Sequence, residues 1–410
     1  YDYIKLESSN HRNLFYPLIF NFFNFINIDI ITFQICFLAL SISFLISILI
    51  SYKFNKISIL FFWLILACNT YYTSFAKTIL PEKLFFSFIN FIIGIILLSK
   101  KQFNYPMVFV FSILISLIAI TKKIGIMFTF LFITYFFFTN RSLLKRGIVL
   151  IIVIIIILLE NISFLKFHDK RGSVLPNIVM GKLFYITGND SFYLDNYRVI
   201  KKFSNEFELI KKKSMEINNF VNSFENIFVR AEIQSDYEVV LQYQNIFELE
   251  NYNEISETIQ SNYKIIFLDI LKHNFIEYLT ISFSHYVGMW VGGTKKSSEF
   301  QNRLISNKVP FDNFLEKSSS NMNLPKEVLL QISSIYFKTL LIIFALTSIF
   351  HLLEIFISRK INIINYFLLM CNCYLCVVSF INVSTVRYLM PIYPIVILVI
   401  FLIVNKTILK

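Results

Sequence analysis

Charged residues are scarce in this chain. Asp, Glu, Lys and Arg make up 16% of its 410 residues, whereas 56% are hydrophobic. A soluble domain has about 25% charged residues and roughly 45–50% apolar ones. The apolar segments therefore exceed what the core of a soluble fold can bury. The composition excludes a soluble globular protein and predicts an integral membrane protein.

Glycine residues and groups of potential metal ligands are scarce as well. The chain has 9 Gly residues and no internal repeat, whereas secondary transporters are built from repeats with Gly- or Pro-broken helices. All five cysteines lie inside apolar segments, and "CNCYLC" (371–376) lacks the paired spacing of a zinc site, which favours packing as its role. No Asp, Glu or His cluster has metal-ligand spacing, so we expect neither a divalent cation nor another cofactor.

The sequence is rich in apolar segments close to the roughly 20 residues that a spanning helix needs. Nine segments qualify: 29–51, 57–75, 83–99, 106–121, 123–139, 147–165, 335–357, 362–382 and 389–405. Residues 14–26 are too short to span and predict an interfacial helix that leads into the first span. We therefore expect an all-α polytopic membrane protein.

Lys and Arg in the short loops predict the orientation, because cytoplasmic loops carry an excess of them. One set of loops holds eleven of these residues and the alternate set holds five. The first set is predicted to be cytoplasmic, which places the start of the chain on the outer face. An outer start without a signal peptide implies at least one further span before Tyr1. The same loop bias accounts for the net charge of +12, so we expect no nucleic acid partner.

We expect three regions along the chain. They are a transmembrane region with an outer-face motif loop (1–165), a mainly helical extracytoplasmic segment (166–333) and C-terminal transmembrane helices (334–410). Within the second region, residues 263–293 carry apolar side chains at helical spacing opposite a charged face. This pattern predicts a helix lying in the membrane interface. A tenth span at 275–291 is the alternative.

Several polar residues map to the outer ends of the predicted spans, against the positive-inside trend. Ionisable residues in or near membrane segments are functional candidates by default. Those at the outer ends are His11, Arg12, Glu82, Lys122, Lys123 and Arg387, with Tyr388 next to the last. Cations gathered at one interface suit an anionic ligand, because Arg and Lys bind phosphate through charge-assisted hydrogen bonds. Lys77 and Lys83 are interpreted instead as helix-end side chains that snorkel to water.

Five sequence stretches, in this order, resemble motifs of the GT-C fold glycosyltransferases. The similar branch contains the protein O-mannosyltransferases and the lipid A aminoarabinose transferases (glycosyltransferase family 39-like). The stretches are "HRNLFYP" (11–17), "LPEKLF" (80–85), "LIAITKKIGIMF" (117–128), "ILKHNFIEYLTISFSHYVGMW" (270–290) and "RYLMPIYP" (387–394). Asn13 stands where the family usually has Pro.

The resemblance implies a GT-C-like helical bundle and an inverting glycosyltransferase. Its donor would be a polyprenyl-phosphate sugar and its acceptor a glycan, a lipid or a protein. The reaction would take place on the outer face of a bacterial inner (plasma) membrane. An O-antigen polymerase or ligase, which also uses polyprenyl-linked sugars, is one alternative. A polytopic transporter or flippase is an alternative from another class.

The resemblance also implies roles for individual residues. Asp2 would be the general base. Alternatively, Tyr3 corresponds to the Tyr that follows the acid in the family, and the acid itself precedes Tyr1. Glu82 is either acceptor-facing or structural. The remaining candidates share an expected place at the donor phosphate: His11, Arg12, Tyr16, Lys122, Lys123, Arg387 and Tyr388.

Overall fold

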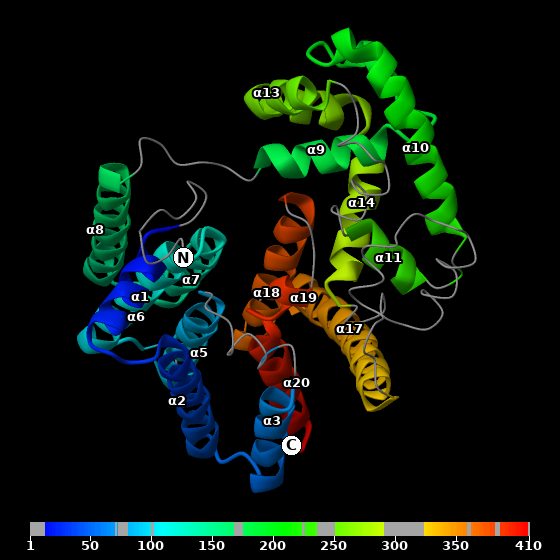
Figure 1. Ribbon diagram of the computed structural model, residues 1–410. Helices are drawn as coiled ribbons and strands as arrows, with labels where there is room; N and C mark the ends of the chain where they lie inside the picture. The colour runs from blue at the N-terminus through cyan, green and yellow to red at the C-terminus, as the bar shows by residue number, and fades with distance from the viewer. Residues whose placement is uncertain are drawn as a thin grey trace. The chain divides into compact units, whose positions relative to one another are not determined.

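The computed structural model (Figure 1) is helical throughout the part of the chain that it describes. The described residues are 13–69, 72, 81–99, 102–167, 175–223, 225, 227–235, 251–290, 324–358, 362–381 and 386–408. Among them there are helices and connections, with no strand. Five helices are long and apolar enough to cross a membrane: Ile30–Ser51, Glu82–Ser99, Leu143–Lys166, Ile335–Ser358 and Ile363–Ile381. The chain is therefore an all-α, multi-pass membrane protein, as its composition predicts.

The chain forms two compact units. Unit 1 comprises residues 1–173, 351–374 and 390–410, and unit 2 comprises residues 174–350 and 375–389. The grouping differs from three consecutive regions because two of the C-terminal helices, α17 (Leu324–Ser358) and α18 (Ile363–Ile381), are each divided between the units.

Unit 1 consists mostly of apolar helices. Besides the parts of α17 and α18, they are α1 (Phe15–Phe25), α2 (Ile30–Ser51), α3 (Lys56–Ala67), α5 (Glu82–Ser99), α6 (Tyr105–Thr121), α7 (Gly125–Thr139), α8 (Leu143–Phe167) and α20 (Tyr393–Ile408). Several begin at a polar cap: Asn104 accepts from the Met107 backbone N–H at 2.9 Å, which satisfies a donor at the start of α6. The helix predicted from 389 begins at Tyr393 instead, after Pro391, because proline lacks the N–H that a helix interior needs.

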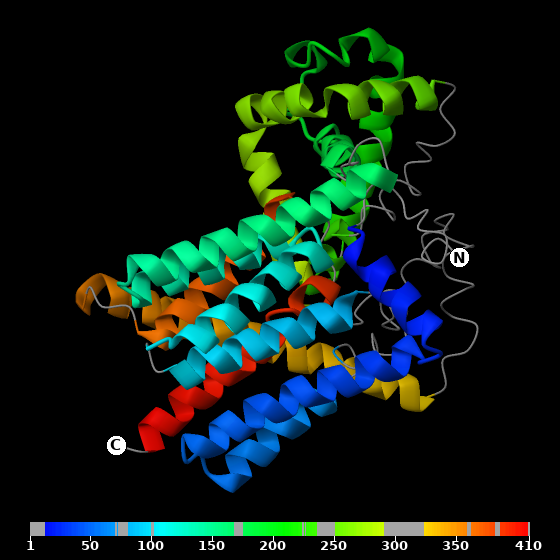
Figure 2. The ribbon, with the colours of Figure 1, turned by 90° about the vertical axis from the view of Figure 1, so that its left-hand side faces the viewer.

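Helix α5 lies at the centre of unit 1, against α2 on one side and α6 on the other (Figure 2). It buries 89% of its spanning window, whereas α8 buries 17% and exposes a row of Ile and Leu side chains. Gly94 lets α2 approach α5 closely, since a Cβ there would lie 2.4 Å from the Phe44 ring. The outer helices thus present most of the apolar surface that a bilayer covers, and α5 presents little.

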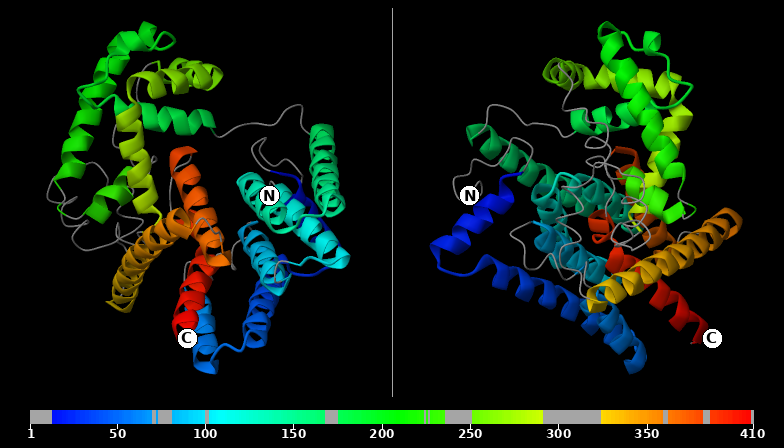
Figure 3. Two further views of the ribbon diagram at one scale, coloured as in Figure 1. Left: turned by 180° about the vertical axis from the view of Figure 1, so that it is seen from behind. Right: turned by 45° about the vertical axis from the view of Figure 1, so that its right-hand side comes forward.

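Unit 2 packs its helices around a hydrophobic core of its own. Figure 3 shows these helices from two further directions. It contains α9 (Leu175–Ile186), η2 (Leu194–Asn196), η3 (Lys201–Phe203), α10 (Ser204–Asn222), α11 (Ile227–Ser235), α13 (Tyr252–His273), α14 (Phe275–Gly288), α19 (Val386–Leu389) and the remaining parts of α17 and α18. Helix α9 contacts both α10 and α13, and the core includes Tyr197, Phe207 and Ile270.

The prediction of one continuous interfacial helix over 263–293 is wrong, because the helix is interrupted at Asn274. Residues 252–288 form α13 and α14, which are separated at Asn274, whose backbone is non-helical (φ −134°, ψ 42°). The Asn274 side chain donates to the Ser191 hydroxyl at 3.1 Å and accepts from the Tyr197 hydroxyl at 2.8 Å. These bonds to another segment of unit 2 hold the break in place, and helical spacing alone does not reveal them.

Candidate functional site

The start of α5 carries two charged residues that are entirely buried. Glu82 and Lys83 follow Pro81 and are both 0% exposed. Lys122 donates through its Nζ to Glu82 Oε1 at 3.0 Å. Glu82 also lies in the first turn of α5, where the helix dipole favours a negative charge. The negative charge of the buried Glu82 carboxylate is therefore balanced by the Lys122 ammonium and by the positive end of the α5 dipole.

Lys122 reaches Glu82 because of the turn between α6 and α7. Its backbone is extended (φ −148°, ψ 138°), which ends α6, and its carbonyl accepts from the Gly125 N–H at 2.7 Å. A Cβ at Gly125 would lie 2.0 Å from the Ile118 carbonyl oxygen. Glycine at this position thus permits the close approach that aims Lys122 towards α5.

Lys83 faces a polar network within the apolar core. Its Nζ donates to the Tyr72 carbonyl oxygen and lies 5.5 Å from the centre of the Tyr72 ring. Asn90 Nδ2 donates to the Tyr72 hydroxyl and to Ser41 Oγ, each at 3.0 Å. The Tyr72 ring lies 5.8 Å from that of Tyr393, whose hydroxyl donates to a backbone carbonyl of α3. The network therefore connects α2, α3, α5 and α20.

This burial corrects the interpretation of Lys83 as a snorkelling side chain, because its amine lies inside the unit and not at a helix end in water. The sequence contained a signal for the network. Lys83, Ser87 and Asn90 are spaced i, i+4, i+7 and so share one face of a spanning helix. A polar stripe along a buried span marks a functional candidate.

The stretch that follows Arg12 is attached to the same end of unit 1. Asn13 Nδ2 donates to the Ala119 carbonyl oxygen at 3.2 Å, three residues before Lys122. The Leu14 N–H donates to Glu160 Oε1 of α8 at 3.1 Å. The Asn13 side-chain amide satisfies a carbonyl in the last turn of α6.

The structure brings some of the predicted site residues together. Glu82, Lys122 and Lys123 lie at one end of unit 1, close to the stretch that begins at Asn13. Tyr16, which follows Asn13 closely in the sequence, is buried, and its hydroxyl accepts from Gln34 Nε2 at 2.5 Å. This buried hydrogen bond joins α1 to α2, which gives Tyr16 a role in packing.

The other predicted residues are not placed against this cluster. Asp2, His11 and Arg12 lie outside the described residues. Arg387 and Tyr388 belong to α19 of unit 2. The expected binding of one phosphate by Arg12 together with Arg387 and Tyr388 therefore stays a prediction. Lys122 is already paired with Glu82, so it binds an anion only by sharing or leaving that carboxylate.

Unit 2 contains a second buried lysine that the sequence did not single out. Lys182 of α9 donates to the Phe380 carbonyl at 2.7 Å, the Ser379 carbonyl at 3.0 Å and Ser282 Oγ at 3.1 Å. Its Nζ lies 4.3 Å from the centre of the Tyr278 ring. Burial lowers the pKa of Lys182 to about 7. The two carbonyls belong to the last turn of α18, so this lysine serves as a helix C-cap.

Known proteins give no further assignment. Comparison of the chain with protein-family models, with curated proteins and with solved structures finds no match. Within the described part of the chain, no three His, Cys, Asp or Glu side chains lie together as potential metal ligands. This chain's own residues therefore carry any functional assignment.

Proposed function

We propose that the protein is a GT-C-like membrane glycosyltransferase that takes a sugar from a polyprenyl-phosphate donor. The proposal rests on one observation above all: three of the five motif stretches meet at the same end of unit 1. Glu82 of "LPEKLF" pairs with Lys122 of "LIAITKKIGIMF", and Asn13 of "HRNLFYP" bonds Ala119 of that same stretch. These positions are 40 to 106 residues apart in sequence.

The chemistry has clear physical demands. A carboxylate removes the proton from an acceptor hydroxyl as its oxygen bonds to the anomeric carbon, and the bond from that carbon to the phosphate oxygen breaks on the opposite side. The base must lie within hydrogen-bond reach of the hydroxyl. Cations must offset the charge that builds on the departing lipid phosphate. In this proposal Asp2, or an acid before Tyr1, is the base, and Arg12, Arg387 and Tyr388 bind the phosphate.

The buried pair gives Lys122 a defined part in this scheme. With no donor bound, Glu82 neutralises Lys122, so no uncompensated cation is held near the lipid. A lipid phosphate bound beside the turn between α6 and α7 competes with Glu82 for the Lys122 ammonium.

The test is turnover of purified full-length protein in proteoliposomes with a set of polyprenyl-phosphate hexoses and pentoses. Arg12→Ala and Tyr388→Phe should each reduce release of polyprenyl phosphate without loss of folded protein. Lys166→Gln, which removes an exposed lysine in the last turn of α8, should leave it unchanged.

Two outcomes would count against the proposal. Wild-type turnover in both Arg12→Ala and Tyr388→Phe would show that the site is misassigned. Movement of a labelled lipid or solute across the vesicles without any glycosyl transfer would favour a transporter instead.

A further inference from the structure

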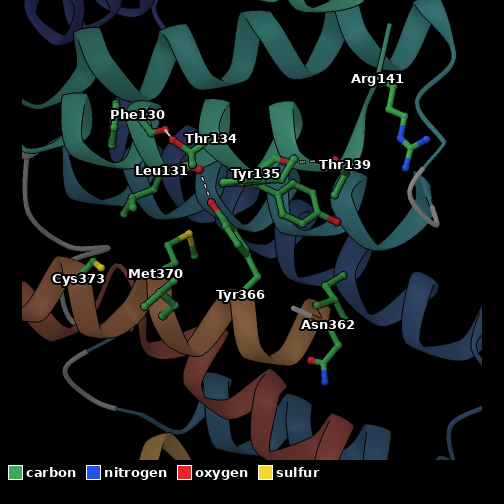
Figure 4. Close-up of a pocket in the computed structure, with 13 residues that line it drawn as sticks. Phe130, Leu131, Thr134, Tyr135, Thr139, Arg141, Asn362, Tyr366, Met370 and Cys373 are labelled. Atoms are coloured by element: carbon green, nitrogen blue, oxygen red, sulfur yellow. Dashed lines mark hydrogen bonds between the residues drawn. The ribbon is translucent and has the colours of Figure 1, made fainter. Parts of the chain in front are cut away.

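A groove of about 510 Å³ runs between α7 and the first half of α18, entirely within unit 1 (Figure 4). It lies in the range of volumes that hold small ligands, about 300–1,000 Å³. No Asp or Glu lines it. None of the residues proposed for glycosyl transfer takes part in it.

The groove changes from polar to apolar along its length. Thr139, Arg141 and Asn362 lie at one end, and Phe130, Leu131 and Cys373 lie at the other (Figure 4). The stretch of α7 from 130 to 139 rises about 1.5 Å per residue and is therefore about 14 Å long. This length is close to one leaflet, half of a hydrocarbon core about 30 Å thick.

One side of the groove is open and the floor is closed. Phe130 and Phe138 are 68% and 77% exposed. On the floor, the buried Tyr135 and Tyr366 rings lie 4.6 Å apart, and the Tyr366 hydroxyl donates to the Leu131 carbonyl. The floor thus offers ring faces and a satisfied hydroxyl, which suit a hydrocarbon chain more than a polar ligand.

The polar end is positively charged. Arg141 is exposed, and its guanidinium makes no hydrogen bond or ion pair with the described residues. The neighbouring cations are engaged elsewhere: Lys145 donates to the Phe103 carbonyl, and Arg146 donates to the carbonyls of Phe137 and Asn140. The positive end of the α18 dipole lies at the same place. By the loop charges, this end faces the cytoplasm.

We propose that this groove binds one anionic phospholipid of the cytoplasmic leaflet. The lipid phosphate lies at Arg141, and one acyl chain extends along the ring faces of Tyr135 and Tyr366 towards Phe130. The occupant follows from three matches: the leaflet-long span, the polar-to-apolar gradient and a lining cation, Arg141, at headgroup depth. The site lies at the opposite end of α7 from Lys122 and does not depend on the proposed glycosyl transfer.

The experiment measures lipid retention by the purified full chain. Protein in detergent is mixed with equal amounts of phosphatidylglycerol and phosphatidylethanolamine, diluted, and examined by native mass spectrometry. Wild type should retain one phosphatidylglycerol in preference to phosphatidylethanolamine by about tenfold, because the ammonium group of phosphatidylethanolamine offsets the phosphate charge that attracts Arg141. Arg141→Gln should bring the two lipids to equal retention, and Thr134→Trp, which fills the middle of the groove, should abolish retention of both.

The matched control for Thr134→Trp is Ile154→Trp, which adds the same ring at an exposed position of α8 and should retain lipid like wild type. A headgroup preference that survives Arg141→Gln would overturn the proposal. So would equal retention by Thr134→Trp and Ile154→Trp, since the lipid would then lie elsewhere. Arg141 is exposed, so its variant remains informative even where Thr134→Trp fails to fold.

Discussion

Replacing Lys122 with Gln should destabilise unit 1 more than replacing Glu82 with Gln, although both changes remove the same ion pair. The side chain of Glu82 is wholly buried, whereas that of Lys122 is 18% exposed. Lys122→Gln removes the Lys122 ammonium from a carboxylate that is wholly buried. Glu82→Gln leaves an amine that can turn towards its exposed side and an amide oxygen that still accepts from it.

The magnitudes follow from this asymmetry. Removal of one partner from a buried pair costs about 3–5 kcal/mol, and the dipole at the start of α5 brings Lys122→Gln to the lower end of that range. Loss of charge with retention of a hydrogen bond makes Glu82→Gln cost about 1 kcal/mol. The difference of about 2 kcal/mol corresponds to about 4–8 °C in unfolding temperature, on the scale for units of 150–250 residues.

The assay is thermal unfolding in detergent, with the unfolding temperature compared among variants. The double variant Glu82→Gln/Lys122→Gln keeps a neutral hydrogen-bonded pair and should be more stable than Lys122→Gln alone. Lys166→Gln, a surface change, should shift stability by less than about 1 kcal/mol. Equal destabilisation by the two single changes would refute the reasoning, as would strict additivity in the double variant.

Three further predictions concern other contacts. Asn13→Ala should destabilise the attachment of α1 by about 1 kcal/mol, because a carbonyl at the end of α6 loses its donor; thermal unfolding against wild type measures this. Gly125→Ala should destabilise unit 1, since its Cβ would meet the Ile118 backbone oxygen, whereas Gly147→Ala, with nothing within 4 Å, should be neutral or stabilising. The lowered pKa of Lys182 means that the unfolded chain holds a proton between about pH 7 and pH 10 that the folded chain has released. Stability should therefore rise with pH across that window, and Lys182→Met should remove the rise.

Five of the nine predicted spans are confirmed as helices long and apolar enough to cross a membrane, because length and apolar content largely decide them. The segments predicted as spans at 57–75, 106–121, 123–139 and 389–405 contain apolar helices of 10–17 residues instead. Residues 14–26 were correctly expected to form a short helix, α1. Sequence spacing also marks Glu82 and Lys122 as unusual. Sequence spacing does not predict the ion pair between them. Forty residues of chain separate the two side chains, and the antiparallel packing of α5 and α6 brings them together.

Lys83 and Asn274 show two further limits of sequence reasoning. A lysine one residue inside a span reads as a snorkelling side chain, and its direction depends on which face of α5 the neighbouring helices cover. Asn274 interrupts a pattern that is helical on both sides, because its side chain bonds Ser191 and Tyr197. In both cases a contact from a distant segment overrides the local preference.

The two ends of unit 1 hold their charges in different ways, and this difference bears on function. At the end predicted to be cytoplasmic, Lys145 and Arg146 bind backbone carbonyls near the ends of helices, and loop charge together with helix capping accounts for them. At the other end, Glu82 and Lys83 are buried without access to water. Neither topology nor capping requires charges there, and their desolvation is costly. We propose that this end holds the anion site, with Lys122, whose side chain is 18% exposed, as its accessible cation and the buried charges behind it.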